Sequence, residues 1–157
     1  MRLPIVLLVA AAAALPLSTV LAQADDSKVM LIARDQVQAA FAKGRPMIEV
    51  GDYKIHASRR EGPGMAEIHT RDTDIAYVLR GSATLVTGGT AIGVNAIGPE
   101  ELRGSAIEGG ETRRLVPGDV VVIPNGVPHW FKEVKAPFLY YVIKVRQAPR
   151  GQTVGAM

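Results

Sequence analysis

Two histidines and a glutamate are the residues of this chain whose types and spacing could do chemistry. Glu67 and His69 lie two residues apart in an apolar stretch, so in a β-strand their side chains leave the same face. His129 follows two turn sequences, at 117–119 and 124–126, whose glycines can adopt positive φ. A histidine held rigidly by such turns is suited to be a metal ligand or a general base.

The same group, extended by one carboxylate, suits a divalent metal ion. A neighbouring strand that contributes Asp74 would bring its side chain to Glu67 and the two histidines. Two imidazoles with one or two carboxylates suit Fe(II), Mn(II), Zn(II) or Ni(II), and a carboxylate-rich set favours manganese or iron over copper. The alternative for His69 alone is a core histidine with hydrogen-bonded nitrogens, because buried polar groups are usually paired.

Short apolar runs punctuated by Gly, Pro and Asp predict that β-strands position these residues. The runs cover 47–50, 53–58, 65–69, 75–79, 83–87, 115–116, 120–123 and 138–145. Many short strands separated by turn signals indicate a sandwich or a barrel. The irregular stretch 90–114 is expected to be a long connection with one hairpin around 108–111.

The segment before the predicted barrel carries a different pattern. Residues 29–32 form a strand-like apolar run, and a helix follows in which Asp35 is the N-cap and Gly44 the C-terminal stop. We therefore expect an N-terminal strand and helix within residues 25–46, followed by a β-barrel over 47–146.

The first 24 residues predict a secretory signal peptide. Arg2 precedes the apolar run 5–17, and Ala22 and Ala24 give the small-x-small pattern of a cleavage site. The run is short for a bilayer span and is interrupted by Pro16. We expect a periplasmic or secreted protein that keeps no membrane attachment after cleavage, with a flexible tail over 147–157.

Composition restricts the class of protein further. A chain of 157 residues has room for a single domain. Its 18 basic and 15 acidic residues give a net charge of +3, which is too balanced to indicate a nucleic-acid partner. The chain has no cysteine, so its stability must come from burial and backbone pairing rather than from disulfides.

Two stretches resemble the two motifs of the cupin superfamily. Residues 64–81 read GMAEIHTRDTDIAYVLRG, and residues 118–129 read GDVVVIPNGVPH. His69 falls at the second histidine position of the first motif, and His129 at the ligand position of the second. Glu67 stands where the first histidine is usual, and Asp74 stands where a glutamate is usual.

The resemblance extends over about residues 53–145 and implies an all-β, single-domain jelly-roll barrel of the small cupin 2-like type, preceded by a short helix. It implies a manganese, iron or zinc ion held by Glu67, His69, Asp74 and His129. Asp74 is shorter by one methylene than the usual glutamate. The alternative is that it does not reach the metal and instead orients His69 by accepting a hydrogen bond from it. The resemblance also implies a homodimer.

Other residues complete the predicted pocket. We expect Tyr77, Phe131 and Tyr140 to line it, because aromatic side chains in apolar strands pack inward. His56 is expected on the solvent face, the alternative being that it substitutes for the missing first histidine. The arginines at 59–60 are interpreted as solvated strand ends, although an arginine at the barrel mouth could hold an anionic substrate through two hydrogen bonds.

These observations support two functions of different classes. The first is an exported metal-binding cupin that acts on a small organic molecule, with dioxygenase, isomerase or lyase chemistry. The second is a non-catalytic cupin module that binds a small ligand without metal. The fold hosts many chemistries, so the sequence does not choose among reactions.

Overall fold

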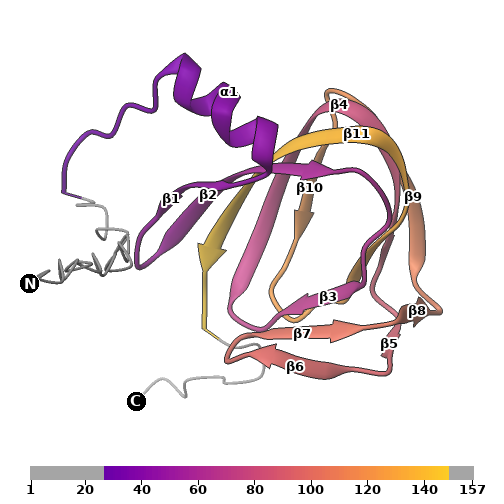
Figure 1. The fold of residues 1–157 in the computed structure, drawn as a ribbon. Helices are drawn as coiled ribbons and strands as arrows, with labels where there is room; N and C mark the ends of the chain where they lie inside the picture. Colours follow the sequence, from indigo (N-terminus) through magenta and orange to yellow (C-terminus); the bar gives the residue numbers. More distant parts are fainter. Residues whose placement is uncertain (1–26, 149–157) are drawn as a thin grey trace, which may run out of the picture.

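The computed structural model describes residues 27–148, in which one helix precedes a curled antiparallel sheet that forms a half-barrel (Figure 1). The elements are α1 (Arg34–Lys43), β1 (Pro46–Glu49), β2 (Tyr53–Arg60), β3 (Ala66–His69), β4 (Asp72–Thr87), β5 (Thr90–Ile92), β6 (Asn95–Gly98), β7 (Glu101–Gly104), β8 (Ala106–Glu108), β9 (Glu111–Leu115), β10 (Val120–Ile123) and β11 (His129–Arg146). The predicted all-β jelly-roll architecture with a short helix is confirmed. The predicted signal peptide and most of the predicted tail lie outside the described residues.

The two longest strands organise the sheet. β4 and β11 pair with each other along most of their length, and β11 also pairs with β2 and, through its first residue, with β3. β10 and β9 pair with opposite ends of β4, and β7 pairs with β3. Segments that are far apart in the sequence therefore face one interior (Figure 1). Within the described residues, no helix is long and apolar enough to span a membrane.

The inward face of β4 changes phase at a glycine. Ala76 and Val78 are buried before Gly81, whereas Ala83 and Leu85 are buried after it, so the buried positions switch from even to odd numbers. Gly81 has a φ of +78°, and a Cβ there would lie 2.5 Å from the carbonyl oxygen of Pro137. Only glycine adopts this conformation without strain, which explains the glycine that ends the first motif.

Aromatic side chains of β11 fill the centre of the core. Phe138 is fully buried, and its ring centroid lies 5.1 Å from that of Tyr140 and 5.7 Å from that of Phe131. Ring centroids at these separations give favourable aromatic contacts in addition to the burial of apolar area. Leu85 of β4 belongs to the same buried cluster and is also fully buried.

The N-terminal segment differs from its prediction in one element. Residues 29–32 form no strand, and the side chains of Val29 and Leu31 are exposed, because no strand within residues 27–148 pairs with them. The helix begins after Ala33, whose N–H donates to the side chain of Gln36, so Asp35 lies in the first turn and is not the N-cap. The predicted stop at Gly44 is confirmed by its left-handed conformation.

The irregular stretch 90–114 contains more regular structure than the sequence indicates. It forms four short strands, β5 to β8, and most of β9, where one hairpin is expected around 108–111. The strands on either side of that turn have other partners, since β8 pairs with β5 and β9 pairs with β4. Strands of three or four residues leave little periodicity in a sequence. Among these short strands, β7 matters most for the site, because it places Arg103 opposite Glu67.

Two leucines of β4 test whether the interior core stabilises the fold. Leu85→Ala should lower the free energy of unfolding by about 3 kcal/mol, because it leaves a cavity in a fully buried cluster. Leu79→Ala, at a side chain that is 39% exposed, should lower it by less than about 1 kcal/mol. Urea unfolding of both variants measures the difference, and equal losses would contradict this packing.

Candidate functional site

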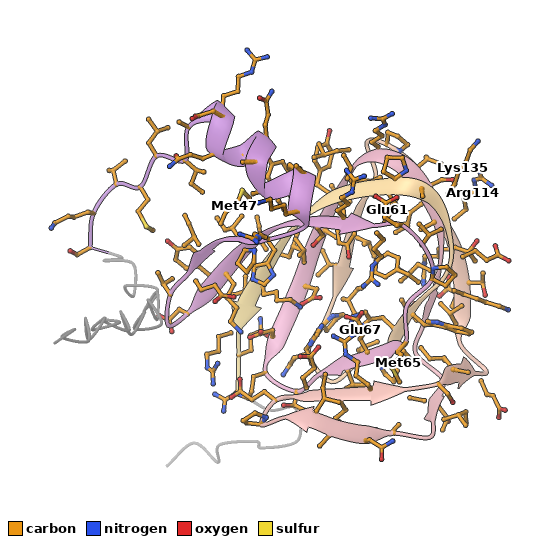
Figure 2. The ribbon with its side chains drawn as sticks, in the orientation of Figure 1. Met47, Glu61, Met65, Glu67, Arg114 and Lys135 are labelled. Atoms are coloured by element: carbon orange, nitrogen blue, oxygen red, sulfur yellow. The ribbon has the colours of Figure 1, made fainter. Side chains whose placement is uncertain are left out.

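The fold brings the four predicted ligand residues together inside the curled sheet. β3 supplies Glu67 and His69 from one face, β4 supplies Asp74, and β11 supplies His129, which is paired directly opposite Glu67. Each of the four is less than a tenth exposed, and His129 is 2% exposed. Figure 2 shows Glu67 pointing into this interior, whereas Arg114 lies at the outer edge of the sheet.

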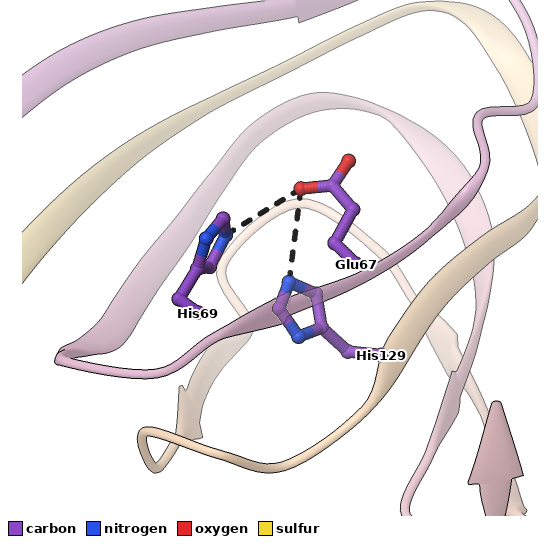
Figure 3. A group of neighbouring side chains, drawn as sticks. All are labelled: Glu67, His69 and His129. Atoms are coloured by element: carbon purple, nitrogen blue, oxygen red, sulfur yellow. Dashed lines mark ion pairs between the residues drawn. The ribbon is translucent and has the colours of Figure 1, made fainter. Parts of the chain in front are cut away.

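The ligating atoms of three of these residues form a compact group (Figure 3). Glu67 Oε2 lies 3.5 Å from His69 Nε2 and 3.8 Å from His129 Nε2. Asp74 Oδ2 approaches the same two nitrogens at 3.5 and 3.9 Å. Within the part of the chain that is described, Glu67, His69 and His129 are the group whose ligating atoms all lie within 4.8 Å of one another.

Both imidazoles present a nitrogen to this centre. His129 Nδ1 lies 3.1 Å from the carbonyl oxygen of Val127, so Nδ1–H donates to it and the lone pair of Nε2 faces the site. Burial lowers the pKa of His129 although Asp74 and Glu67 raise it, which favours the neutral, ligating form. His69 Nε2 is buried and has no hydrogen-bond partner among the described residues, which is unusual for a buried polar atom.

The two oxygens of Glu67 are divided between two kinds of partner. Oε1 accepts hydrogen bonds from Arg60 Nη2 at 2.7 Å and pairs with Arg103 Nη1 at 2.5 Å, while Oε2 faces the histidines. Burial alone would raise the pKa of Glu67. The contact with His69 and the charges of Arg60 and Arg103 outweigh burial and hold that pKa well below its usual range, so the side chain is ionised.

Asp74 is held by a lysine that sequence reasoning did not identify. Lys144 Nζ lies 2.8 Å from both carboxylate oxygens of Asp74. The position of Lys144 within the apolar run 138–145 gave no signal for a site residue. Asp74 therefore lies between the histidine pair and a cation, and it is more strongly engaged by other protein groups than Oε2 of Glu67 is.

Arg60 is not the solvated strand end that the sequence indicated. Its Nε donates to the hydroxyl of Tyr140 at 3.0 Å, and its Cζ lies 4.3 Å from the ring centroid of Phe131. The correction follows from strand alternation, since Arg60 leaves the same face of β2 as Ser58, and both line the interior. Arg59, on the opposite face, is exposed and pairs with Glu61.

A cavity of about 350 Å³ adjoins the group. It is lined by Ser58, Arg60, Glu67, Asp74, Ala76, Arg103, Ile123, His129, Phe131, Tyr140, Val142 and Lys144, and is called the central cavity below. Phe131 and Tyr140 are thus in its wall. The prediction for Tyr77 is wrong, because its side chain is 45% exposed on the outward face of β4, one residue out of phase with Ala76.

His56 does not join the group. Its Nε2 lies 3.0 Å from Glu49 Oε1 at the β1 edge, and its side chain is 22% exposed. Burial lowers the pKa of His56 although the contact with Glu49 raises it. His56 is therefore half-buried on the same face of β2 as Ser58, which differs from the solvent-facing position expected.

The chain belongs to the cupin family, since residues 55–156 match the family model described as Cupin. Among solved structures, a protein from Bacillus halodurans is similar at 14% identity, with 80% of this chain and 88% of that chain covered and a TM-score of 0.56. KdgF from a Halomonas species is 20% identical over 66% of this chain and 79% of its own, with a TM-score of 0.47.

Hydroquinone 1,2-dioxygenase from Sphingomonas sp. TTNP3 is 14% identical over 76% of this chain and 81% of its own, with a TM-score of 0.47. No curated protein matches the chain at a significant level. At 14% identity, the Bacillus halodurans structure supports the fold alone.

The ion pairs of Glu67 predict a pH-dependent stability in the metal-free protein. A carboxyl group whose pKa is lowered by folding contributes stability that is fully present above its unfolded pKa of about 4.3, and this contribution falls by about 1.4 kcal/mol per pH unit below that value. Glu67→Gln should therefore cost about 3 kcal/mol at pH 7 and clearly less at pH 3.

Glu61→Gln is the matched control, because the Glu61 side chain is 60% exposed and pairs with Arg59 at the surface. It should change the free energy of unfolding by less than about 0.5 kcal/mol at either pH. Urea unfolding with a chelator present measures both variants. A loss for Glu67→Gln that is the same at pH 7 and pH 3 would show that its ionised form is not what the arginines stabilise.

Proposed function

We propose that this chain is an exported metal-binding cupin that holds a manganese, iron or zinc ion and acts on a small organic molecule. The observation that carries the proposal is the buried, unpartnered Nε2 of His69, which faces Glu67 Oε2 and lies in one group with His129 Nε2. A divalent cation at this point would satisfy the nitrogen that the protein leaves unpaired.

The donor set fits such an ion. Two neutral imidazoles and one ionised carboxylate are the ligands of the 2-His-1-carboxylate type, which leaves further positions open for a substrate. Arg60 and Arg103 engage Oε1 of Glu67 and so leave Oε2 to face the histidines. When bound, a divalent ion would supply Lewis-acid chemistry or a redox centre.

The protein's own groups would orient the ligands and the substrate. The carbonyl of Val127 fixes the tautomer of His129, and the two arginines fix the carboxylate of Glu67. Lys144 holds Asp74, which would complete the metal shell or support His69. Burial raises the pKa of Tyr140 against the effect of Arg60, so its hydroxyl in the cavity wall keeps its proton at neutral pH.

The finer parts of the proposal rest on the sequence. Export to the periplasm or beyond rests on the signal-peptide pattern of residues 1–24, which lie outside the described residues. The proposed reaction is of the dioxygenase, isomerase or lyase type, because one fold carries many reactions. A homodimer stays a prediction from the family resemblance.

A second function, small-ligand binding without metal, is favoured by a specific observation. Arg60 and Arg103 already neutralise Glu67, and Lys144 already neutralises Asp74, so the carboxylates are satisfied by the protein itself. A buried carboxylate needs partners of this kind when no cation is present. Metal binding separates the two functions.

The three histidines of the chain provide a matched test of the metal site. Protein stripped with a chelator and titrated with Mn(II), Fe(II) or Zn(II) should bind one ion per chain. His69→Ala and His129→Ala should each weaken binding by more than about 100-fold, which exceeds the usual loss when only a supporting residue is removed. His56→Ala should bind as the parent does, because His56 pairs with Glu49 outside the group.

Calorimetry and elemental analysis measure these affinities, and circular dichroism checks that each variant is folded. Equal binding by the parent and the folded His69→Ala, His129→Ala double variant would overturn the metal proposal. Absence of binding by the parent would leave the metal-free function as the better one.

A further inference from the structure

The charge balance around the central cavity restricts what can bind beside the metal. Three cationic side chains line it, Arg60, Arg103 and Lys144, together with two carboxylates, Glu67 and Asp74. Glu101, which pairs with Arg103 on β7, supplies a third carboxylate next to the cavity. Three cations therefore meet three carboxylates, and this cluster has a formal charge of zero before any ion binds.

Two further ion pairs do not change the balance, because each pairs one cation with one carboxylate. Lys54 pairs with Asp72 at 3.0 Å, and Arg146 pairs with Glu100. His69 contributes no formal charge when it acts as a neutral metal ligand, and neither does His129. Adding a divalent ion to a neutral cluster leaves two uncompensated positive charges in a largely buried place.

Uncompensated charge in a buried site is energetically unfavourable. Two histidines and a carboxylate without other charged neighbours would leave a smaller excess of positive charge after the metal binds. The carboxylate would then neutralise part of the charge of the ion. In this chain that carboxylate charge is already matched by Arg60 and Arg103 at Oε1. The missing negative charge must then come from the ligand.

The cavity wall selects among anions. Arg60 is fixed by Tyr140, by Glu67 Oε1 and by the Phe131 ring, and the remaining N–H donors of its planar guanidinium match the shape of a carboxylate. Beside it lie apolar side chains of Ile123 and Val142. A volume of about 350 Å³ with one charged and one apolar side suits a small organic acid better than a bare inorganic anion, which would leave the apolar wall unmatched.

We infer that the small molecule bound in the metal-loaded central cavity is an organic carboxylate, with dianions preferred over monoanions and neutral analogues. This inference rests on the proposed metal-binding function and names its substrate class. Arg103 is the residue that makes it testable, because its side chain is 24% exposed and reaches Glu67 from the peripheral strand β7. Arg60 is more deeply enclosed and is less suitable for substitution.

A series of equal size and different charge tests the inference. Succinate, succinamate and succinamide carry two, one and no negative charges on the same carbon skeleton. Calorimetry on the Zn(II)-loaded protein at pH 7 should give affinities in that order, with succinate at least about tenfold tighter than succinamide. By thermodynamic linkage, succinate should tighten Zn(II) binding by the same factor by which Zn(II) tightens succinate binding.

Two arginines with the same local ion-pair pattern provide the control. Arg103 and Arg113 each pair with a glutamate two residues earlier on the same strand, but Arg113 lies on β9 and does not line the central cavity. Arg103→Gln should weaken succinate binding at least about tenfold when parent and variant are both compared with Zn(II) at saturation, so that a change in Zn(II) affinity from the lost contact with Glu67 does not enter the comparison. Arg113→Gln should change neither the succinate affinity nor the Zn(II) affinity. Arg103→Lys keeps the positive charge but lacks the planar pair of donors, so its succinate affinity should lie between those of the parent and Arg103→Gln.

The outcomes separate this inference from the metal proposal. Zn(II) titrated alone reports on the metal, whereas equal affinities across the series on the loaded protein overturn only the carboxylate inference. The absence of succinate binding at about 10 mM also overturns it, because the dissociation constant would then lie well above that concentration. Inorganic phosphate that binds more tightly than succinate would replace the organic acid with a phosphate ligand, and so would also overturn it.

Discussion

The rest of the site depends on two ion pairs, which Arg60 and Arg103 form with the same oxygen of Glu67. An ionised carboxylate inside a curled sheet is unstable without partners. Both partners engage Oε1, which fixes the plane of the carboxylate and directs Oε2 toward the two imidazoles. The same two contacts stabilise the buried charge and leave Oε2 facing the histidines, as the proposed metal site requires.

These two ion pairs constrain the fold, because the three residues that form them come from strands that are distant in sequence. β2 supplies Arg60, β3 supplies Glu67, and β7 supplies Arg103. β11 connects them by pairing with β2 and by placing His129 opposite Glu67. A shift of one residue in any of these pairings would turn the side chains to the outer face. The long β4–β11 pairing, with its phase change at Gly81, keeps the interior register fixed.

Much of the candidate metal group could be predicted from the sequence because its signals are local. Glu67 and His69 share a face by alternation, and the turns before His129 have a distinctive spacing. Tyr77 was misplaced because the apolar run 75–79 offers hydrophobic side chains to both faces, so periodicity does not determine which one is inward. Composition alone predicts a strand at 29–32, but a strand needs a partner, and among the described residues no strand pairs with it.

The cations were missed for a different physical reason. Arg103 lies in the stretch 90–114, whose short strands acquire their register only by pairing with β3 and with one another. Lys144 and Arg60 look like ordinary polar positions until the sheet curls and encloses them. Ion pairs across strands depend on tertiary closure, which a single sequence does not encode locally. Their presence turns a plain ligand set into one whose charge is already balanced.

The central claim is that Glu67 Oε2 and the Nε2 atoms of His69 and His129 together hold one divalent ion. A crystal structure of the Mn(II)-loaded protein, with an anomalous difference map, tests it most directly. The account predicts a single strong peak at about 2.0–2.3 Å from those three atoms, with both arginines still on Oε1 of Glu67. A peak elsewhere on the chain, or none at this position, would contradict it.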